Sequence, residues 1–272
     1  MKSNLSISSF AAAAFQVACA LAAKDTSLLV FTKTAGYRHA SIPKGIELVT
    51  SIANEKQWAV TATEDSSIFT IEQLSNFTTL VFISTTGNFL ANNESDALHQ
   101  YLQNGGSWLG IHAAGDFGDS MPSWYNDLVG GQFLAHPCWV TEICSAEQKA
   151  KYPLDGNIRP DIVTITNATH PSTSNLPTIH NRTDEWYSYK TNPSQSANYQ
   201  VLATLEETYI DSITPPETLK MTPDHPISWY SLFEGTARAW YTGMGHTNES
   251  YSEDYFVSHV TGGLEWVTGL KD

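Results

Sequence analysis

The segment GGSWLGIHAAGD at residues 105–116 combines a glycine pair, a short apolar run and a turn of small residues around one histidine. Gly105 and Gly106 are typical of a helix end, and WLGIH at residues 108–112 predicts a buried strand. The small residues that follow allow a sharp strand-to-helix turn, similar to a nucleophile elbow, which exposes the side chain of His112. This order of elements is typical of an α/β fold.

Strand and helix patterns alternate on the amino-terminal side of this segment. SLLVFTKT at residues 27–34 and TLVFIST at residues 79–85 are almost continuously apolar, as expected of strands buried on both faces. A shorter strand pattern covers residues 58–63, and a helix begins at Pro43 with Ser41 as its candidate cap. The succession predicts a parallel sheet with helices on both sides.

The carboxyl-terminal half is irregular between residues 137 and 226, where Pro, Thr, Ser and Asn are frequent. Its expected elements are strands at residues 161–165, 199–205, 227–233 and 237–244 and a final helix at residues 253–267. The last two strands form a hairpin that turns at Glu234 and Gly235. We therefore expect a three-layer α/β sandwich with a mostly parallel central sheet, a late β-hairpin and a C-terminal helix.

Composition limits the classes of partner. Hydrophobic residues make up 41% of the 272 residues, which is enough for a sizeable core. The chain has 28 acidic and 14 basic side chains and a net charge of −14, so neither nucleic acid nor a membrane is an expected partner. A chain with 15% charged and 11% aromatic residues favours neutral polar ligands, such as small or oligomeric carbohydrates.

The first residues predict secretion through a eukaryotic secretory pathway to an extracellular location. Residues 1–22 are typical of a signal peptide, with Lys2, an apolar run over residues 10–21 and small residues before the expected cleavage site. The mature chain, residues 23–272, is expected to be a single domain. Sequons for N-glycosylation occur at Asn76, Asn93, Asn167, Asn181 and Asn248.

Two cysteines stay in the mature chain. Cys138 and Cys144 lie six residues apart, and in an oxidising compartment this spacing predicts a local disulfide. Two buried free thiols are the alternative. A thiolate metal site lacks the further cysteines that it would need.

Polar residues follow the predicted strands at the points where they end. In open parallel sheets, ligands bind at the carboxyl ends of the strands. The residues expected to meet at this edge are Tyr37, Arg38, His39, His112, Asp116 and His246.

Each of these residue types has both a chemical and a structural interpretation. His112 can serve as a base, an acid, a metal ligand or an orienting donor, or it can only bind neighbouring loops. His39, His136 and His246 have the same choice of roles, and Asp116 can orient an imidazole or cap a helix. The sequence DEWY places two carboxylates, Asp184 and Glu185, beside Trp186 and Tyr187. This group can bind sugar hydroxyls while a ring stacks on a pyranose, or it can form a solvated loop with both rings in the core. Structural roles are expected for the other histidines, His99, His170, His180, His225 and His259.

Several motifs in order resemble the ThuA-like (trehalose-utilisation) family, which has the flavodoxin-like fold of class I glutamine amidotransferases. The motifs are FTKTAGYRHASIP at 31–43, GGSWLGIHAAGD at 105–116, LVGGQFLAHP at 128–137, DEWY at 184–187, HPISWY at 225–230 and RAWYTGMGHTNESY at 238–251. The resemblance implies activity on sugars or oxidised sugars. His112 stands where amidotransferases have a nucleophilic cysteine, so glutaminase chemistry is excluded. Residues 138–161 form an enlarged segment compared with the family pattern.

The leading hypothesis is therefore a secreted carbohydrate-active enzyme of hydrolase, lyase or isomerase type. In this hypothesis His112, His246, Asp116 and Glu185 are catalytic, and the substrate-binding residues are Arg38, His39, Tyr37, His136, Trp186 and Tyr187. In a second version a divalent metal is bound by His39, His112, His136 and His246. A non-catalytic carbohydrate-binding protein is the rival from another class. No dinucleotide fingerprint follows the first strand, so a nicotinamide or flavin cofactor is not expected.

Overall fold

The computed structural model describes residues 25–138, 144–154, 156–210 and 219–272. The predicted signal peptide, residues 1–22, lies outside the described residues. Among the helices that are described, none has the length and hydropathy of a membrane-spanning segment. Four of the five sequon asparagines are exposed in the described chain, and Asn167 is half-buried.

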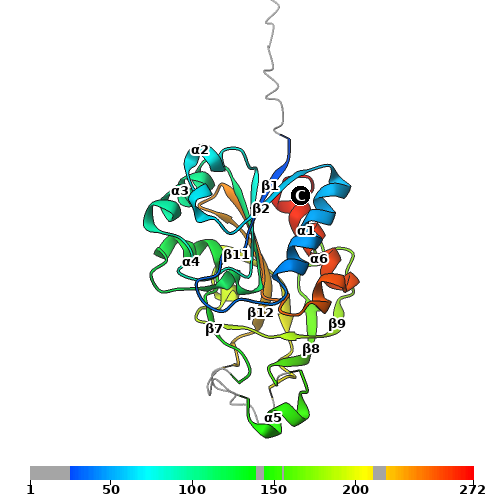
Figure 1. The fold of residues 1–272 in the computed structure, drawn as a ribbon. Helices are drawn as coiled ribbons and strands as arrows, with labels where there is room; N and C mark the ends of the chain where they lie inside the picture. Colours follow the sequence, from blue (N-terminus) through cyan, green and yellow to red (C-terminus); the bar gives the residue numbers. More distant parts are fainter. Residues whose placement is uncertain (1–24, 139–143, 155, 211–218) are drawn as a thin grey trace, which may run out of the picture.

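A nine-stranded sheet forms the centre of the described chain, in the order β2-β1-β3-β5-β13-β12-β11-β8-β9 (Figure 1). Its strands are β1 (Ser27–Phe31), β2 (Ala59–Thr63), β3 (Thr79–Ile83), β5 (Ser107–Ile111), β8 (Ile158–Ile165), β9 (Ile179–Glu185), β11 (Tyr199–Leu205), β12 (His225–Phe233) and β13 (Ala237–Thr242). Two short pairs lie outside it, β4 (Thr86–Gly87) with β6 (Asp116–Phe117) and β7 (Phe133–Ala135) with β10 (Ser188–Tyr189).

Strand direction decides which loops meet. β2, β1, β3, β5 and β13 are parallel to one another, and every pairing from β13 to β9 is antiparallel. Two antiparallel steps restore the original direction, so β11 and β9 run the same way as β13. The carboxyl end of β9 therefore lies at the same edge of the sheet as the carboxyl ends of β1, β5 and β13.

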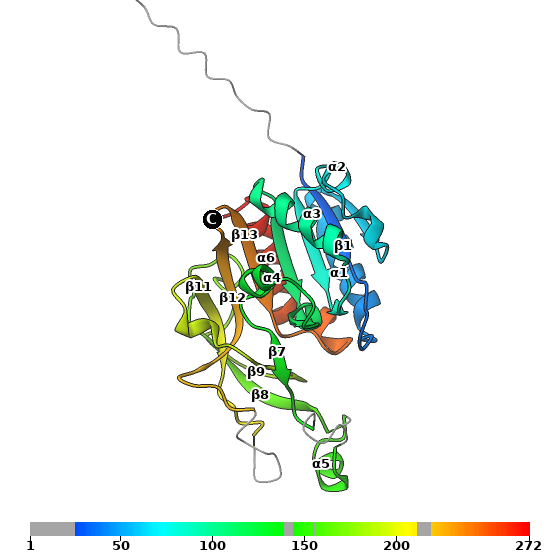
Figure 2. The same ribbon diagram turned by 90° about the vertical axis from the view of Figure 1, so that its left-hand side faces the viewer.

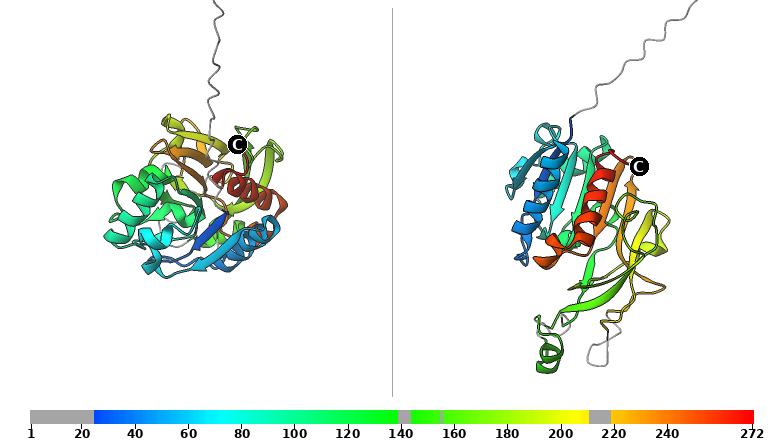
Figure 3. Two further views of the ribbon diagram at one scale, coloured as in Figure 1. Left: turned by 90° about the horizontal axis from the view of Figure 1, so that it is seen from above. Right: turned by 90° about the vertical axis from the view of Figure 1, so that its right-hand side faces the viewer.

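Helices cover both faces of the sheet (Figure 3). One face carries α1 (Ile42–Lys56) and α6 (Asp254–Val267), and the other carries α2 (Ile71–Leu74), α3 (Asn92–Gln103) and α4 (Ser123–Val129). The segment with α5 (Ala146–Lys151) projects beyond the carboxyl edge of the sheet, beside β7 and β8 (Figure 2). Short 3₁₀ turns occur at Ser66–Ile68, His112–Gly115, Pro193–Gln195 and Glu249–Ser252.

Alternating side chains of the strands build two cores. In β1, Leu28 and Val30 pack with the residues of α1 and α6, whereas Leu29 and Phe31 pack with those of α3. Because successive side chains in a strand point to opposite faces, a fully apolar strand serves both layers at once. The predicted three-layer sandwich with its mostly parallel sheet is confirmed.

The late hairpin turns at Glu234 and Gly235 as predicted, with φ of 48° and 75°. Ser41 stands at the N-cap position of α1 as predicted, but its side chain makes no capping hydrogen bond. Its hydroxyl instead donates to the carbonyl oxygen of Gly245 at 3.3 Å. β9 lies in a stretch for which no strand was predicted, because its alternation of exposed and buried residues includes charged residues on the buried side, such as Arg182 and Asp184.

Candidate active site

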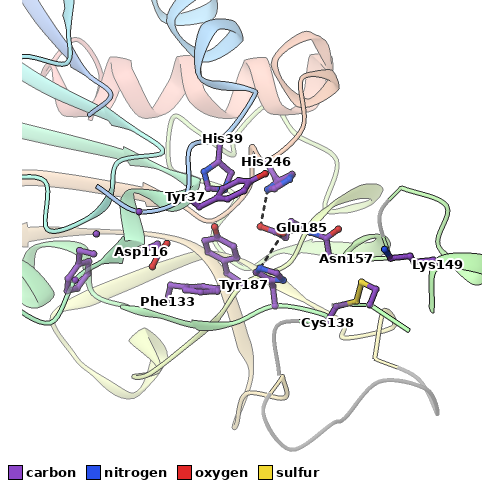
Figure 4. A pocket seen from close by; sticks show the side chains of 16 residues that line it. Tyr37, His39, Asp116, Phe133, Cys138, Lys149, Asn157, Glu185, Tyr187 and His246 are labelled. Carbon is purple, nitrogen blue, oxygen red and sulfur yellow. Dashed lines mark hydrogen bonds and ion pairs between the residues drawn. A yellow bond between two sulfur atoms is a disulfide. The ribbon is translucent and has the colours of Figure 1, made fainter. Parts of the chain in front are cut away.

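Four residues from distant parts of the chain meet at the carboxyl edge of the sheet. His39 lies between β1 and α1, His112 directly follows β5, Glu185 is the last residue of β9, and His246 follows β13. The close view in Figure 4 shows His39, His246 and Glu185 gathered at one side of a pocket. The shared direction of the four strands explains why these loops converge.

Glu185 is the centre of this group. Its Oε2 lies 2.9 Å from Nδ1 of His246 and 3.4 Å from Nε2 of His112, and its Oε1 lies 3.5 Å from Nε2 of His136. Nδ2 of Asn157 also donates to Oε1. The Glu185 side chain is only 3% exposed, so imidazole and amide groups take the place of water around its carboxylate.

The charges of the cluster follow from burial and from these neighbours. Burial alone would raise the pKa of Glu185, but the imidazoles of His136, His112 and His246 together hold that pKa well below its ordinary value. Burial, and then the nearby His112 and His246, lower the pKa of His39 to about 2. At neutral pH the site therefore combines an anionic carboxylate with a neutral His39 ring.

His112 occupies a strained, tightly packed turn. Its φ is 52°, and its ring has no exposed surface. Nδ1 donates to the carbonyl oxygen of Gly243 at 2.8 Å, while the Tyr241 hydroxyl donates to the His112 carbonyl oxygen at 2.8 Å. A Cβ at Gly115 would lie 2.6 Å from that same Tyr241 hydroxyl, which explains why the turn needs a residue without a side chain.

Asp184 holds the loop that carries His246. The sequence did not predict a separate role for this residue. Its carboxylate accepts hydrogen bonds from the backbone N–H groups of Gly245 (2.8 Å) and His246 (3.0 Å), and it pairs with Arg182 at 3.2 Å. The DEWY motif therefore holds two carboxylates with different tasks. Glu185 contacts the imidazoles, and Asp184 fixes the loop that carries His246.

The group opens into a cavity of about 670 Å³. Among the predicted site residues, those that line it are Tyr37, His39, Asp116, His136, Glu185, Tyr187 and His246. Burial raises the pKa of Asp116 despite the nearby imidazoles. Lining residues that the sequence did not indicate are Phe117, Gly118, Phe133, Lys149 and Asn157. The last two belong to the enlarged segment 138–161, and only that enlargement pointed to them.

Two predicted substrate-binding residues lie elsewhere. Trp186 is fully buried, and its Nε1 donates to the carbonyl oxygen of Arg159 at 2.7 Å. Strand alternation continues past β9, so Glu185 and Tyr187 face the cavity while Trp186 points into the core. Arg38 forms an exposed ion pair with Glu64 at 2.6 Å and does not line the cavity.

The cavity wall also contains the predicted disulfide. Cys138 and Cys144 are bonded to each other, which confirms the local pairing, and both line the cavity (Figure 4). The five histidines with expected structural roles do not line it; these are His99, His170, His180, His225 and His259.

A model of the trehalose-utilisation family, ThuA, matches residues 27–267. The chain belongs to the ThuA-like family. Among solved structures, a ThuA-like protein from Bacteroides uniformis is 21% identical with a TM-score of 0.71, and the match covers 93% of this chain and 95% of that one. A ThuA-like protein from Parabacteroides merdae is 19% identical with a TM-score of 0.65, and 91% of each chain is covered.

These two likenesses establish the ThuA-like fold and say nothing of the reaction. The glutaminase domain of Trypanosoma brucei CTPS is a more distant neighbour, with 10% identity and a TM-score of 0.47. No match was found among curated proteins. In the described residues, His112 stands at the turn after β5, and Cys138 and Cys144 are bonded to each other.

Proposed function

We propose that this ThuA-like protein is a secreted carbohydrate-active enzyme that acts on a sugar or an oxidised sugar in the described cavity. The observation that carries the proposal is the Glu185 carboxylate, with imidazole nitrogens of His246, His112 and His136 at 2.9, 3.4 and 3.5 Å, at the base of this cavity. Secretion is inferred from residues 1–22 alone.

The charge cluster favours an enzyme over a binding protein. A buried carboxylate among imidazoles loses hydration, and a protein that only binds neutral sugars gains nothing from that loss. Perturbed titratable groups gathered in a cleft are typical of catalytic sites. The cavity volume of about 670 Å³ lies in the range of small-molecule sites, roughly 300–1,000 Å³.

The structure changes the roles expected of single residues. His112 has no exposed surface, so it cannot exchange a proton with a substrate directly, and we assign it a supporting role beneath Glu185 and His246. Asp116 and His136 line the cavity and are the candidates for proton transfer. The raised pKa of Asp116 suits a carboxylic acid that donates a proton to a leaving oxygen.

The cavity walls suit a pyranose ring. Tyr37, which is 67% exposed, Phe133 and Tyr187 present aromatic surface, and Lys149 and Asn157 present hydrogen-bond donors. Membership of the trehalose-utilisation family supports a carbohydrate as the ligand class. Acid–base steps at a glycosidic oxygen, or beside a carbonyl of an oxidised sugar, fit the groups that face the cavity.

The test is a turnover assay with neutral disaccharides, trehalose included, and with their keto derivatives. We expect turnover by the wild type and a loss of roughly 10²–10⁴-fold in kcat for Glu185→Gln, because the substitution removes the carboxylate that contacts His246 and His136. The matched control is Glu249→Gln, an exposed carboxylate outside the cavity, which should leave kcat unchanged. Sugar binding by the wild type without turnover of any compound would show a binding protein instead.

A further inference from the structure

We propose that His39, His112, His246 and Glu185 together bind one divalent transition-metal ion. The inference rests on the proposed function, because it names a cofactor for the same site. It replaces the set of four histidines expected from the sequence: Glu185 takes the place of His136.

The first support is distance. Each of the four residues offers one ligand atom, and these atoms all lie within 4.8 Å of one another. Two atoms bound to one ion at roughly 2.0–2.2 Å lie about 3–4.4 Å apart, so side-chain shifts of about 1 Å complete the coordination. Three imidazole nitrogens with one carboxylate oxygen suit zinc, manganese, iron, cobalt or nickel, whereas calcium and magnesium prefer sets of oxygen ligands.

The second support is the orientation of His112. Its Nδ1–H donates to the Gly243 carbonyl oxygen, an outer hydrogen bond that is characteristic of metal-binding histidines. In the neutral ring, Nε2 then directs a lone pair at Nδ1 of His246, 3.1 Å away, and at Oε2 of Glu185, 3.4 Å away. A cation at this point would take the place of the proton that His246 Nδ1 shares with these two acceptors.

The third support is His39. The residue is 4% exposed, and its Nδ1 has no hydrogen-bond partner among the described residues. Buried polar atoms in proteins are normally paired, so an unpaired imidazole nitrogen beside two other imidazoles requires an explanation. The rings of His112 and His246 stand nearly perpendicular to it, with centroids 4.8 and 5.1 Å away, and each of the three rings offers one nitrogen to the group of ligand atoms within 4.8 Å of one another.

The site also has access to a ligand. His39, His246 and Glu185 line the cavity, whereas His112 is fully buried on the side of the cluster away from the cavity. Such an ion would act as a Lewis acid toward an oxygen of the sugar. His136 contacts Glu185 from the cavity wall at 3.5 Å and is outside the ligand set, so its replacement should affect metal binding less than the replacement of a ligand.

The experiment uses the glycosylated, chelator-stripped protein and cobalt(II) as the probe. We expect the wild type to bind one cobalt per chain, with visible absorption typical of nitrogen and oxygen ligands, and to bind zinc in competition. His39→Ala and Glu185→Gln should weaken cobalt binding at least roughly 100-fold, whereas His136→Ala should still bind one cobalt per chain, with a loss of affinity of at most about 10-fold. Far-UV circular dichroism and the urea midpoint show whether each variant is folded.

The wild-type titration needs no variant and can overturn the proposal by itself, through a failure to bind cobalt and zinc stoichiometrically. Binding that survives in both His39→Ala and Glu185→Gln would also overturn it. Stoichiometric binding without sugar turnover would reject the proposed function and leave the metal site standing. Full turnover in the metal-free protein would support the proposed function and reject the metal ion as its cofactor.

Discussion

Adjacent carboxylates in the DEWY motif face in opposite directions and perform separable tasks. Asp184 is fully buried and accepts from two consecutive backbone N–H groups of the His246 loop, while Glu185 faces the imidazoles. Strand alternation produces this division, since neighbouring side chains at the end of β9 leave the strand on opposite sides. His246 is therefore held through its backbone by one carboxylate and contacted at its ring by the other.

Replacing Asp184 by Asn tests the positioning role. The amide keeps the size of the side chain but loses the charge that pairs with Arg182 and one of its two acceptor oxygens. We expect the free energy of unfolding to fall by about 1–3 kcal/mol and cobalt affinity to fall about 10–100-fold, with the stoichiometry retained. Urea denaturation and the cobalt titration measure the two effects.

The control for Asp184→Asn is Asp127→Asn, at an exposed carboxylate on α4, which should change neither quantity. Unchanged cobalt affinity in a destabilised Asp184→Asn protein would limit Asp184 to stability alone.

Helix α6 packs against both the core and the loop that follows β8. Its glycine Gly262 is buried, and a Cβ there would overlap the carbonyl oxygen of Pro171 and the Cα of Ser172. His259, one turn earlier, bonds the Ser172 carbonyl oxygen through Nδ1 at 2.9 Å. The backbones of the helix and the loop are thus in direct contact at Gly262, and only a glycine leaves room for this contact.

Gly262→Ala should lower the free energy of unfolding by about 1–3 kcal/mol, because the neighbouring atoms belong to the backbone and cannot rotate away. The comparison variant, Ser258→Ala on the exposed side of the same helix, should be neutral or slightly stabilising. Urea denaturation measures the free energy of unfolding of both variants and of the wild type. Equal stability of Gly262→Ala and the wild type would mean that the loop moves freely away from α6.

Across the whole molecule, buried neutral histidines link folding to pH. Burial lowers the pKa of His259 to about 3 and that of His170 to about 4. The unfolded chain binds a proton at each near pH 6.5, whereas the folded chain does not until the pH is much lower. Stability is therefore fully present above about pH 6.5 and is lost as the pH falls toward the folded pKa values.

His259→Asn removes one of these titrations. For a folded pKa of about 3, the wild type loses about 2 kcal/mol through His259 between pH 7 and pH 5, a loss that the amide cannot show. We expect the variant to be less stable at pH 7 but to have a shallower decline, measured by urea denaturation at both pH values. Ser258→Ala should keep the wild-type slope, and an equal slope in His259→Asn would show that His259 is charged in the folded protein.

Much of this architecture was predictable from local sequence. Continuous apolar runs, such as the one that forms β3, predicted buried parallel strands, and the small residues around His112 predicted a sharp turn. The six-residue spacing of Cys138 and Cys144 predicted their disulfide. These features depend on neighbours within a few residues, so periodicity and spacing were sufficient.

The position of Glu185 in the site depends on long-range strand pairing, which the local sequence did not predict. β9 joins the sheet by pairing with β8. Four antiparallel pairings separate it from β13, so it runs in the same direction as β13 and brings Glu185 to the edge where His112 and His246 lie. No local pattern records which strand will pair with which, or in what direction, because those choices depend on contacts formed across the whole sheet. The same reason explains why Trp186 was expected in the cavity and lies in the core.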